Sequence, residues 1–257
     1  MKYCLKRQDY DERDFLFSTL IGAITVPTSI DMRKLMPPIY DQLQLGSCSA
    51  NSSTSYDVFL HGNKIQLSRL FEYYMVRKIE GTVDEDSGAT NRDNVNSIKK
   101  SGICEENLMP YDISKFTIPP IDEAISNAKQ YTISSYVALN NLSNIKQALA
   151  MLKPVIVGMD VFESLEGNEI AQTGKMSMPL ITEQNLGGHS VLVVGYVDAI
   201  KTSLKTSIYN FITRKVPTKG YLIVRNSWGV GWGDKGYFYM PYEYLPKYTF
   251  DYWTMNK

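Results

Sequence analysis

The stretch DQLQLGSCSAN, residues 41–51, places a cysteine between two serines, six residues after a glutamine, in a chain with only three cysteines. Ser47 is a residue type that begins helices, so we expect Cys48 in the first turn of a helix that ends near Gly62. A thiol in that position faces free backbone N–H groups and the positive end of the helix dipole, which favour the thiolate. Cys48 is therefore a candidate nucleophile.

Composition limits the classes of function. The 257 residues include 27 basic and 27 acidic side chains, so no long-range field attracts nucleic acid or an anionic membrane. The charged start MKYCLKRQDYDERDF does not resemble a secretory signal, and no apolar stretch is long enough to span a bilayer. An odd, low cysteine count predicts free thiols at Cys4 and Cys104, in a reducing intracellular compartment or a viral particle. We expect a monomer without metal or other cofactor.

The sequence pattern changes partway along the chain and predicts an α+β fold. Residues 47–129 contain mostly helical segments with capping signals, whereas β-branched and aromatic runs separated by turns follow from about residue 131. We expect a helical lobe over 27–130, then an antiparallel β lobe over 131–257, with the active site in the cleft between them. The expected strands lie within 131–140, 153–162, 188–198, 220–228 and 235–241, and a helix is expected over 143–153.

The chain contains two histidines that could act as a base for Cys48. His61 lies about 13 residues further along the same expected helix, several turns from the thiol, and is expected to be an ordinary helix-end residue. His189, in LGGHSVLVVGYVD, begins a β-run after two glycines that allow close backbone approach. It is the candidate base.

Four separated segments together resemble the papain-like, or cathepsin-like, cysteine proteases. They are Gln42 with GSC at 46–48, SGICEENLMPYD at 101–112, GGHSVLVVGY at 187–196 and NSWGVGWGDKGYF at 226–238. The resemblance extends from about residue 27 to the C-terminus. It implies a two-lobed fold and protein or peptide substrates.

The resemblance also implies a role for each matched residue. Cys48 and His189 would rest as a thiolate–imidazolium pair, and the sulfur would attack a peptide carbonyl to form an acyl-enzyme. The side chain of Gln42 would stabilise the oxyanion, together with the N–H of the cysteine. Asn226 would orient the imidazole, and Trp228 would cover that hydrogen bond from water.

The residues expected to bind substrate follow from the same comparison. Gly88, in EDSGATNRD, is expected to make backbone contacts with an extended peptide. Gly158, Met159 and Gly188 are expected near the pocket for the second residue before the cleaved bond. Trp228 is expected at the same site, and the residue that forms the floor of that pocket cannot be aligned.

Two parts of the chain depart from the family pattern. Asn226 lies farther from Cys48 than is usual, and the excess indicates an inserted surface loop near 198–219. Residues 1–26 are too short for the family's long proregion and are similar to those of compact bacterial and viral members. From their aromatic and apolar residues we expect this segment to dock on the surface and cover the cleft, as in a zymogen; a purely structural strap is the alternative.

Other functions are compatible with a cysteine and a histidine. A different thiol acyl-transfer enzyme, such as a transglutaminase or a cell-wall peptide hydrolase, is one alternative, but NSWGVGWG argues against it. A catalytically silent binding protein on a protease fold is another, although all four matched catalytic residues are present. No insertion typical of chain-end trimming is recognisable, so an endopeptidase is expected.

Overall fold

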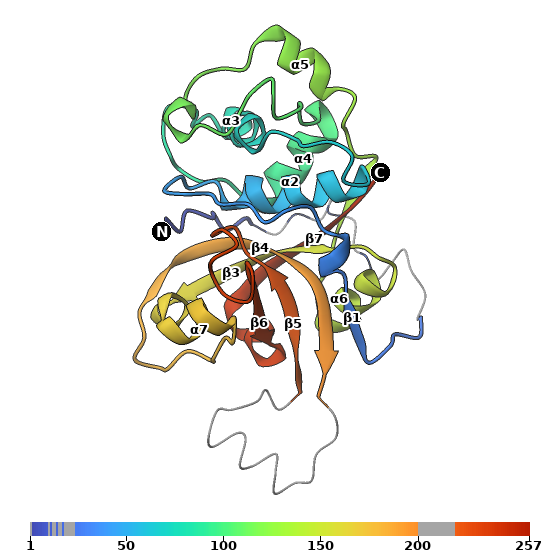
Figure 1. The fold of residues 1–257 in the computed structure, drawn as a ribbon, viewed down its shortest axis with the longest axis vertical. Helices are drawn as coiled ribbons and strands as arrows, with labels where there is room; N and C mark the ends of the chain where they lie inside the picture. The colour runs from blue at the N-terminus through green and yellow to red at the C-terminus, as the bar shows by residue number, and fades with distance from the viewer. Residues whose placement is uncertain (1, 10, 12–13, 15–16, 18–23, 200–218) are drawn as a thin grey trace, which may run out of the picture.

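The computed structural model describes residues 2–9, 11, 14, 17, 24–199 and 219–257. A helical region precedes an antiparallel sheet along the chain, which confirms the α+β prediction (Figure 1). Residues 2–9, which we call the N-terminal arm, run between the helices and the sheet (Figure 1). The central part of the predicted insertion, residues 200–218, lies outside the described residues.

Helices α3 and α4 begin and end at the predicted signals. The Oγ of Ser68 accepts a hydrogen bond from the N–H of Phe71 and caps α3, which ends at Gly81 in the left-handed conformation. Thr90 caps α4, and Gly102 follows its last residue. The helices of this region are α2 (Cys48–Leu60), α3 (Arg69–Glu80), α4 (Asn91–Ser101) and α5 (Asp122–Ala128), with 3-10 turns η1 (Arg33–Leu35) and η2 (Ile113–Lys115).

Within the described residues, seven strands form one antiparallel sheet in the order β2-β7-β3-β4-β5-β6, and β1 pairs with β4. The strands are β1 (Ser29–Asp31), β2 (Ser135–Ala138), β3 (Val155–Phe162), β4 (Asn185–Asp198), β5 (Gly220–Arg225), β6 (Tyr237–Pro241) and β7 (Thr249–Asn256). Between them lie α6 (Leu142–Ala150), α7 (Asn168–Thr173), α9 (Leu245–Tyr248), η3 (Glu163–Glu166) and η4 (Tyr242–Tyr244).

The sequence patterns did not predict strand β7, although it lies inside the sheet between β2 and β3. Its pairing with β3 is interrupted: Gly158 faces Asp251 and Met159 faces Thr249, so Phe250 is left as a bulged residue. A bulge bends the strand and changes the direction of a side chain. Phe250 consequently packs over Gly158, with a ring carbon 2.5 Å from where a Cβ of that glycine would lie.

Helix α2 joins the two regions and is buried on almost every side. It lies between the other helices and the sheet (Figure 1), and 11 of its 13 residues are buried. Most of the buried residues are small and polar, which lets the sheet approach closely, and the hydroxyl of Tyr56 is hydrogen-bonded at 2.7 Å to that of Thr254 in β7. The first residue of α2 is therefore held at the boundary between the helices and the sheet.

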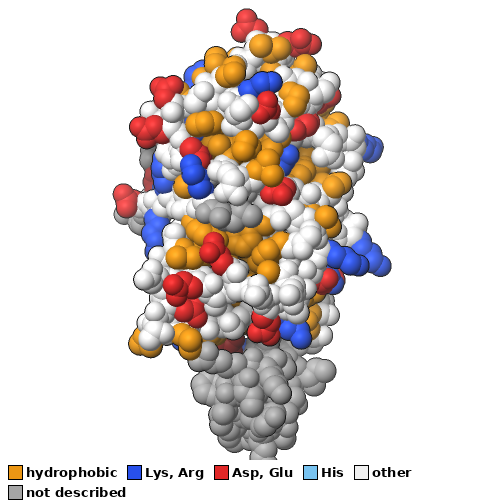
Figure 2. All heavy atoms as spheres, turned by 60° about the vertical axis from the view of Figure 1, so that its left-hand side comes forward, with side chains coloured by type: hydrophobic (Ala, Val, Ile, Leu, Met, Phe, Trp, Pro, Cys, Tyr) orange, Lys and Arg blue, Asp and Glu red, His pale blue; other side chains and the backbone are white. Residues whose placement is uncertain are grey.

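Charged side chains of both signs are interspersed on the face of the molecule shown in Figure 2. This distribution agrees with the expectation, drawn from the equal numbers of basic and acidic residues, that the protein has no long-range field of one sign. Among the described residues, no helix combines the length and the apolar character needed to cross a membrane.

Candidate active site

Cys48 is the first residue of α2 and is fully buried. The preceding Ser47 occupies the cap position but does not cap the helix; its hydroxyl instead pairs with that of Tyr111 at 2.6 Å. Backbone N–H groups of Cys48 itself, Ser49 and Ser190 face the sulfur and favour its thiolate. Because Ser190 directly follows His189, this contact brings the thiol beside the predicted base.

His189 lies in β4 with its ring held on two sides. Its Nε2 is 2.8 Å from the Oδ1 of Asn226, and the indole of Trp228 stacks on it with ring centroids 5.1 Å apart. An amide oxygen can only accept, so the neutral ring carries its proton on Nε2. The buried Nδ1 has no hydrogen-bond partner among the described residues and is left as the free basic nitrogen.

The side chain of Gln42 is fully buried and fixed at both ends. Its Nε2 donates to the carbonyl of Leu45 at 3.0 Å, and its Oε1 accepts from the hydroxyl of Ser227 at 2.6 Å. These two contacts define the orientation of the amide. An amide nitrogen has two hydrogens, and the second is available to another acceptor.

Burial decides the charge of the two reactive groups. It raises the pKa of the Cys48 thiol to about 12, even though three N–H groups oppose the shift. It also lowers the pKa of His189 to about 4, although the hydrogen bond to Asn226 favours the charged ring. In this conformation burial therefore favours a neutral thiol and a neutral imidazole. The thiolate–imidazolium pair expected from the sequence stays a prediction for a site open to water.

The N-terminal arm is the segment that lies over the site, and its even-numbered residues face the helical region. Lys2 forms an ion pair with Asp86 at 2.5 Å. Cys4 lies against two glycines of this region, Gly46 and Gly88. Lys6 forms an ion pair with Glu80 at 2.5 Å, and its backbone N–H donates to the carbonyl of residue 89 at 3.2 Å.

The odd-numbered residues of the arm face the sheet. The ring of Tyr3 packs against Trp228, and its hydroxyl donates to Glu166 at 2.5 Å. The N–H of Leu5 donates to the carbonyl of Gly188 at 3.1 Å, and Arg7 contacts β3. Side chains of an extended chain alternate in direction, so the arm lies as a strand between the two regions and contacts both.

Two of the predicted substrate-binding residues contact the arm through their backbone. A Cβ on Gly88 would lie 1.7 Å from the carbonyl oxygen of Cys4, and one on Gly188 would lie 2.4 Å from that of Leu5. Any side chain at these two positions would displace the arm. Glycine is therefore required at both positions for an extended chain to approach this closely.

Gly158 and Met159, both predicted near the second pocket, point to opposite faces of β3. Neighbouring residues of a strand point to opposite faces, so Met159 faces away from Gly158, and it is fully buried in the core. The N–H of Gly158 donates to the carboxylate of Asp251 at 2.9 Å. Burial raises the pKa of that carboxyl to about 6.

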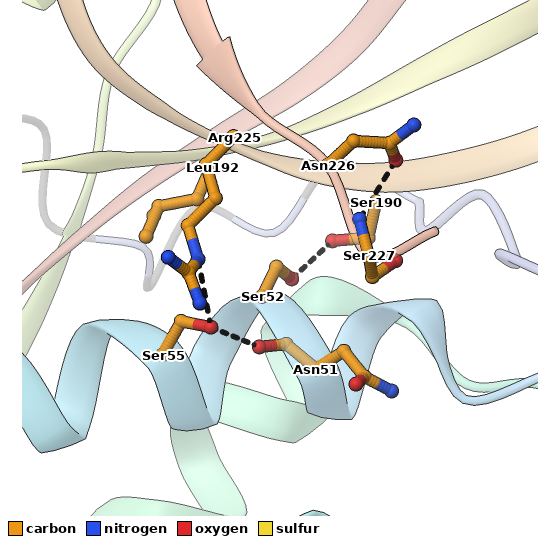
Figure 3. A pocket seen from close by; sticks show the side chains of 8 residues that line it. All are labelled: Asn51, Ser52, Ser55, Ser190, Leu192, Arg225, Asn226 and Ser227. Atoms are coloured by element: carbon orange, nitrogen blue, oxygen red, sulfur yellow. Dashed lines mark hydrogen bonds between the residues drawn. The ribbon is translucent and has the colours of Figure 1, made fainter. Parts of the chain in front are cut away.

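A buried polar network behind the site was not predicted from the sequence. The hydroxyl of Ser52 on α2 pairs with that of Ser190 at 2.6 Å, Ser190 donates to Asn91 at 2.7 Å, and Asn91 donates to Asp251 at 2.7 Å. Figure 3 shows Ser52 and Ser190 lining a polar pocket with Asn226 and Arg225. The network ties α2, β4, α4 and β7 together. No local sequence signal indicates it, since its members are far apart in the chain.

Comparisons with known proteins agree with this geometry. Residues 26–247 match the model of the family described as papain family cysteine protease. A peptidase C1-like protein of Acanthamoeba polyphaga mimivirus is 35% identical over 84% of this chain and 69% of its own length. Cysteine proteinase 3 of Entamoeba histolytica is 28% identical, and the chain spans 62% of its length.

A solved structure is similar over almost the whole chain. The crystal structure of xylellain, a cysteine protease from Xylella fastidiosa, is 31% identical with a TM-score of 0.81 and covers 99% of this chain and 96% of its own. The resemblance inferred from four short segments is confirmed by this match and by the family model. The chain belongs to the papain family of cysteine proteases.

Proposed function

We propose that the chain is an endopeptidase in which Cys48 is the nucleophile and His189 is the acid and base. The observation that supports this most directly is the placement of the Cys48 sulfur at the start of α2, beside the N–H of Ser190, with the neighbouring imidazole held by Asn226. The thiol proton passes to Nδ1 as the sulfur attacks a peptide carbonyl. The imidazolium then protonates the leaving amine, and water activated by the same ring releases the acyl-enzyme.

Gln42 contributes an oxyanion donor in this proposal. Its second Nε2 hydrogen and the N–H of Cys48 would stabilise the negative oxygen of the tetrahedral intermediate. The contacts to Leu45 and Ser227 hold the amide ready before substrate binds. The free energy cost of orienting this donor is therefore met on folding and not during the reaction.

Gln42→Ala is expected to lower kcat by about a hundredfold, or ~3 kcal/mol of transition-state stabilisation, with little change in KM. The reason is that the donor acts on the intermediate and not on the bound substrate. Steady-state kinetics on a fluorogenic peptide would measure this. Gln66→Ala, which removes an exposed side chain whose Oε1 accepts from the hydroxyl of Tyr40 at 3.3 Å, is the control. A rise in KM with unchanged kcat would show that Gln42 binds the substrate and does not stabilise the oxyanion.

The arm acts as an inhibitor of the same site in this proposal. It covers Cys48 and His189, and it pairs with Gly188 as an extended peptide would. Its departure would admit water, lower the pKa of Cys48 and raise that of His189. The thiolate–imidazolium pair would then form in the open enzyme, without net uptake or release of a proton.

A cysteine-directed epoxide tests the function and the inhibition together. Peptide mapping is expected to find one adduct, on Cys48, that is absent from Cys48→Ser. A chain that begins at residue 11 is expected to react about a hundredfold faster than the full chain. Equal rates would refute inhibition by the arm and leave the nucleophile assigned. Failure of both chains to react at Cys48, with circular dichroism showing them folded, would refute the proposed chemistry.

A further inference from the structure

Arg7 of the arm is bound by the sheet through two different contacts. One guanidinium nitrogen lies 2.5 and 2.7 Å from the two carboxylate oxygens of Asp160. The carbon of the same guanidinium lies 4.5 Å from the centre of the Phe250 ring. A carboxylate beside an aromatic face is the combination that binds an arginine by charge and by stacking.

The positions of Asp160 and Phe250 are set by the pairing register of the sheet and not by contact with the arm. Asp160 lies in β3 opposite Gly188 of β4, two residues after Gly158 and therefore on the same face of the strand. The bulge of β7 turns Phe250 toward that face, and the missing side chain of Gly158 leaves room for its ring. Asp160 and Phe250 thus remain in place when the arm is absent.

The position of Arg7 relative to the reacting groups assigns the site to one side of the cleaved bond. Tyr3 packs against His189, with ring centroids 6.1 Å apart, whereas Arg7 lies four residues further along the arm. In the proposed mechanism His189 protonates the leaving amine, which belongs to the carboxyl-terminal part of the substrate. Asp160 therefore faces the amino-terminal part.

The charges of the arm and of its surroundings are complementary. Lys2, Lys6 and Arg7 are neutralised by Asp86, Glu80 and Asp160 respectively. A substrate that replaces the arm removes all three cations and leaves three carboxylates at the site. In the ion pair the side chain of Asp160 is 13% exposed and that of Arg7 is 60% exposed. A cationic side chain of the substrate would restore the charge-assisted hydrogen bonds that Asp160 makes with Arg7.

We propose that Asp160 and Phe250 form a specificity subsite for a basic side chain, arginine above all, at the second or third residue before the cleaved bond. This inference rests on the proposed function and adds the class of substrate to it. The arm places the Arg7 guanidinium in the subsite, although its chain runs in the opposite direction to such a substrate, because Tyr3 lies on the leaving-group side and Arg7 on the other.

Peptidyl acyloxymethyl ketones, which alkylate a reactive cysteine, test the subsite in the full chain. The probes carry either arginine or norleucine at the second or the third residue from the reactive group, and intact mass gives the rate of adduct formation on Cys48. The rates are measured in the range where they rise in proportion to probe concentration, so that displacement of the arm is an equilibrium common to both probes of a pair and cancels in the ratio of their rates. Arginine is expected to react about tenfold faster at one of the two positions.

Asp160→Asn is expected to reduce this ratio to about one, and Phe250→Leu is expected to reduce it about threefold. Arg7→Gln removes the guanidinium that competes for the subsite. The labelling rates of the arginine probe and of the norleucine probe should both rise, and their ratio should stay the same. Asp122→Asn, a change of an exposed aspartate in α5, is the matched control.

Three results would overturn the inference. Equal rates for arginine and norleucine in the wild type, with Cys48 labelled, would overturn the subsite and leave the proposed function standing. A preference for arginine that persists in Asp160→Asn would assign recognition to other residues. No labelling of Cys48 by any probe, in the wild type and in Arg7→Gln, would overturn the proposed function and the subsite together.

Discussion

Cys48→Ala and His189→Ala are each expected to lower kcat/KM on a peptide substrate by at least about 10⁴-fold. Cys48→Ala removes the atom that forms the acyl-enzyme. His189→Ala removes the group that accepts the thiol proton and then protonates the leaving amine. Because the two side chains act as one unit, the double variant is expected to be no less active than either single variant.

This prediction is measured with whichever chain, the full one or the one that begins at residue 11, reacts faster with the cysteine-directed epoxide. The arm then does not limit the rate of peptide cleavage. Cys104→Ala is the control, since it removes another buried thiol and leaves Cys48 in place. The control should keep the wild-type kcat/KM. Residual activity of Cys48→Ala above about one hundredth of the wild type would indicate another nucleophile, and multiplicative losses in the double variant would mean that the two residues act independently.

Asp57→Asn is expected to stabilise the protein by an amount that grows with pH. Asp57 lies inside α2, and neither carboxylate oxygen has a hydrogen-bond partner among the described residues. The nearest basic group, Nε2 of His61, is 3.6 Å away. Burial raises the pKa of Asp57 to about 8, from 3.8 for an exposed aspartate.

The sign of the effect follows from proton binding. Between pH 3.8 and about 8 the folded protein holds a proton on Asp57 that the unfolded chain has released, so the free energy of unfolding falls as pH rises. The slope is about 1.4 kcal/mol per pH unit, or about 4 kcal/mol from pH 4.5 to 7.5. Asparagine does not titrate, so the free energy of unfolding of the variant does not fall with pH for this reason. The variant is therefore about as stable as the wild type near pH 4.5 and more stable at pH 7.5.

Urea unfolding at several pH values measures the difference in the free energy of unfolding between variant and wild type, in which the contributions of ionisable groups distant from residue 57 cancel. Asp122→Asn, which alters an exposed carboxylate in α5, should show no trend. A difference for Asp57→Asn that is constant from pH 4.5 to 7.5 would show that Asp57 is already ionised in the folded protein.

The local features of the candidate site could be predicted because each depends on a short stretch of chain. The cap residue Ser68 and the left-handed Gly81 define the ends of α3 whatever packs around them, and α2 begins at Cys48 as predicted although Ser47 does not cap it. Alternating β-branched runs similarly predicted β3, β4, β5 and β6. Four such segments in the right order were specific enough to identify the family.

The state of the site could not be predicted, because it depends on contacts between distant parts of the chain. The sequence places Cys48 at a helix start and favours a thiolate, but the structure buries the sulfur, and burial raises the pKa of the thiol to about 12. Strand β7 and its bulge were also missed. A bulge exists only relative to the partner strand, so no pattern within residues 249–256 reveals it.

The sequence by itself determined the family, the four candidate catalytic residues and most of the helices and strands, since these depend on local motifs and their order. The tertiary structure decided which distant residues contact one another. The pairing of Arg7 with Asp160 joins residues 153 positions apart, and a balanced composition of 27 basic and 27 acidic side chains gives no sign of it. Charge complementarity of this kind arises only when the chain is folded, because the Coulomb energy depends on the distance in space and not on the separation in sequence.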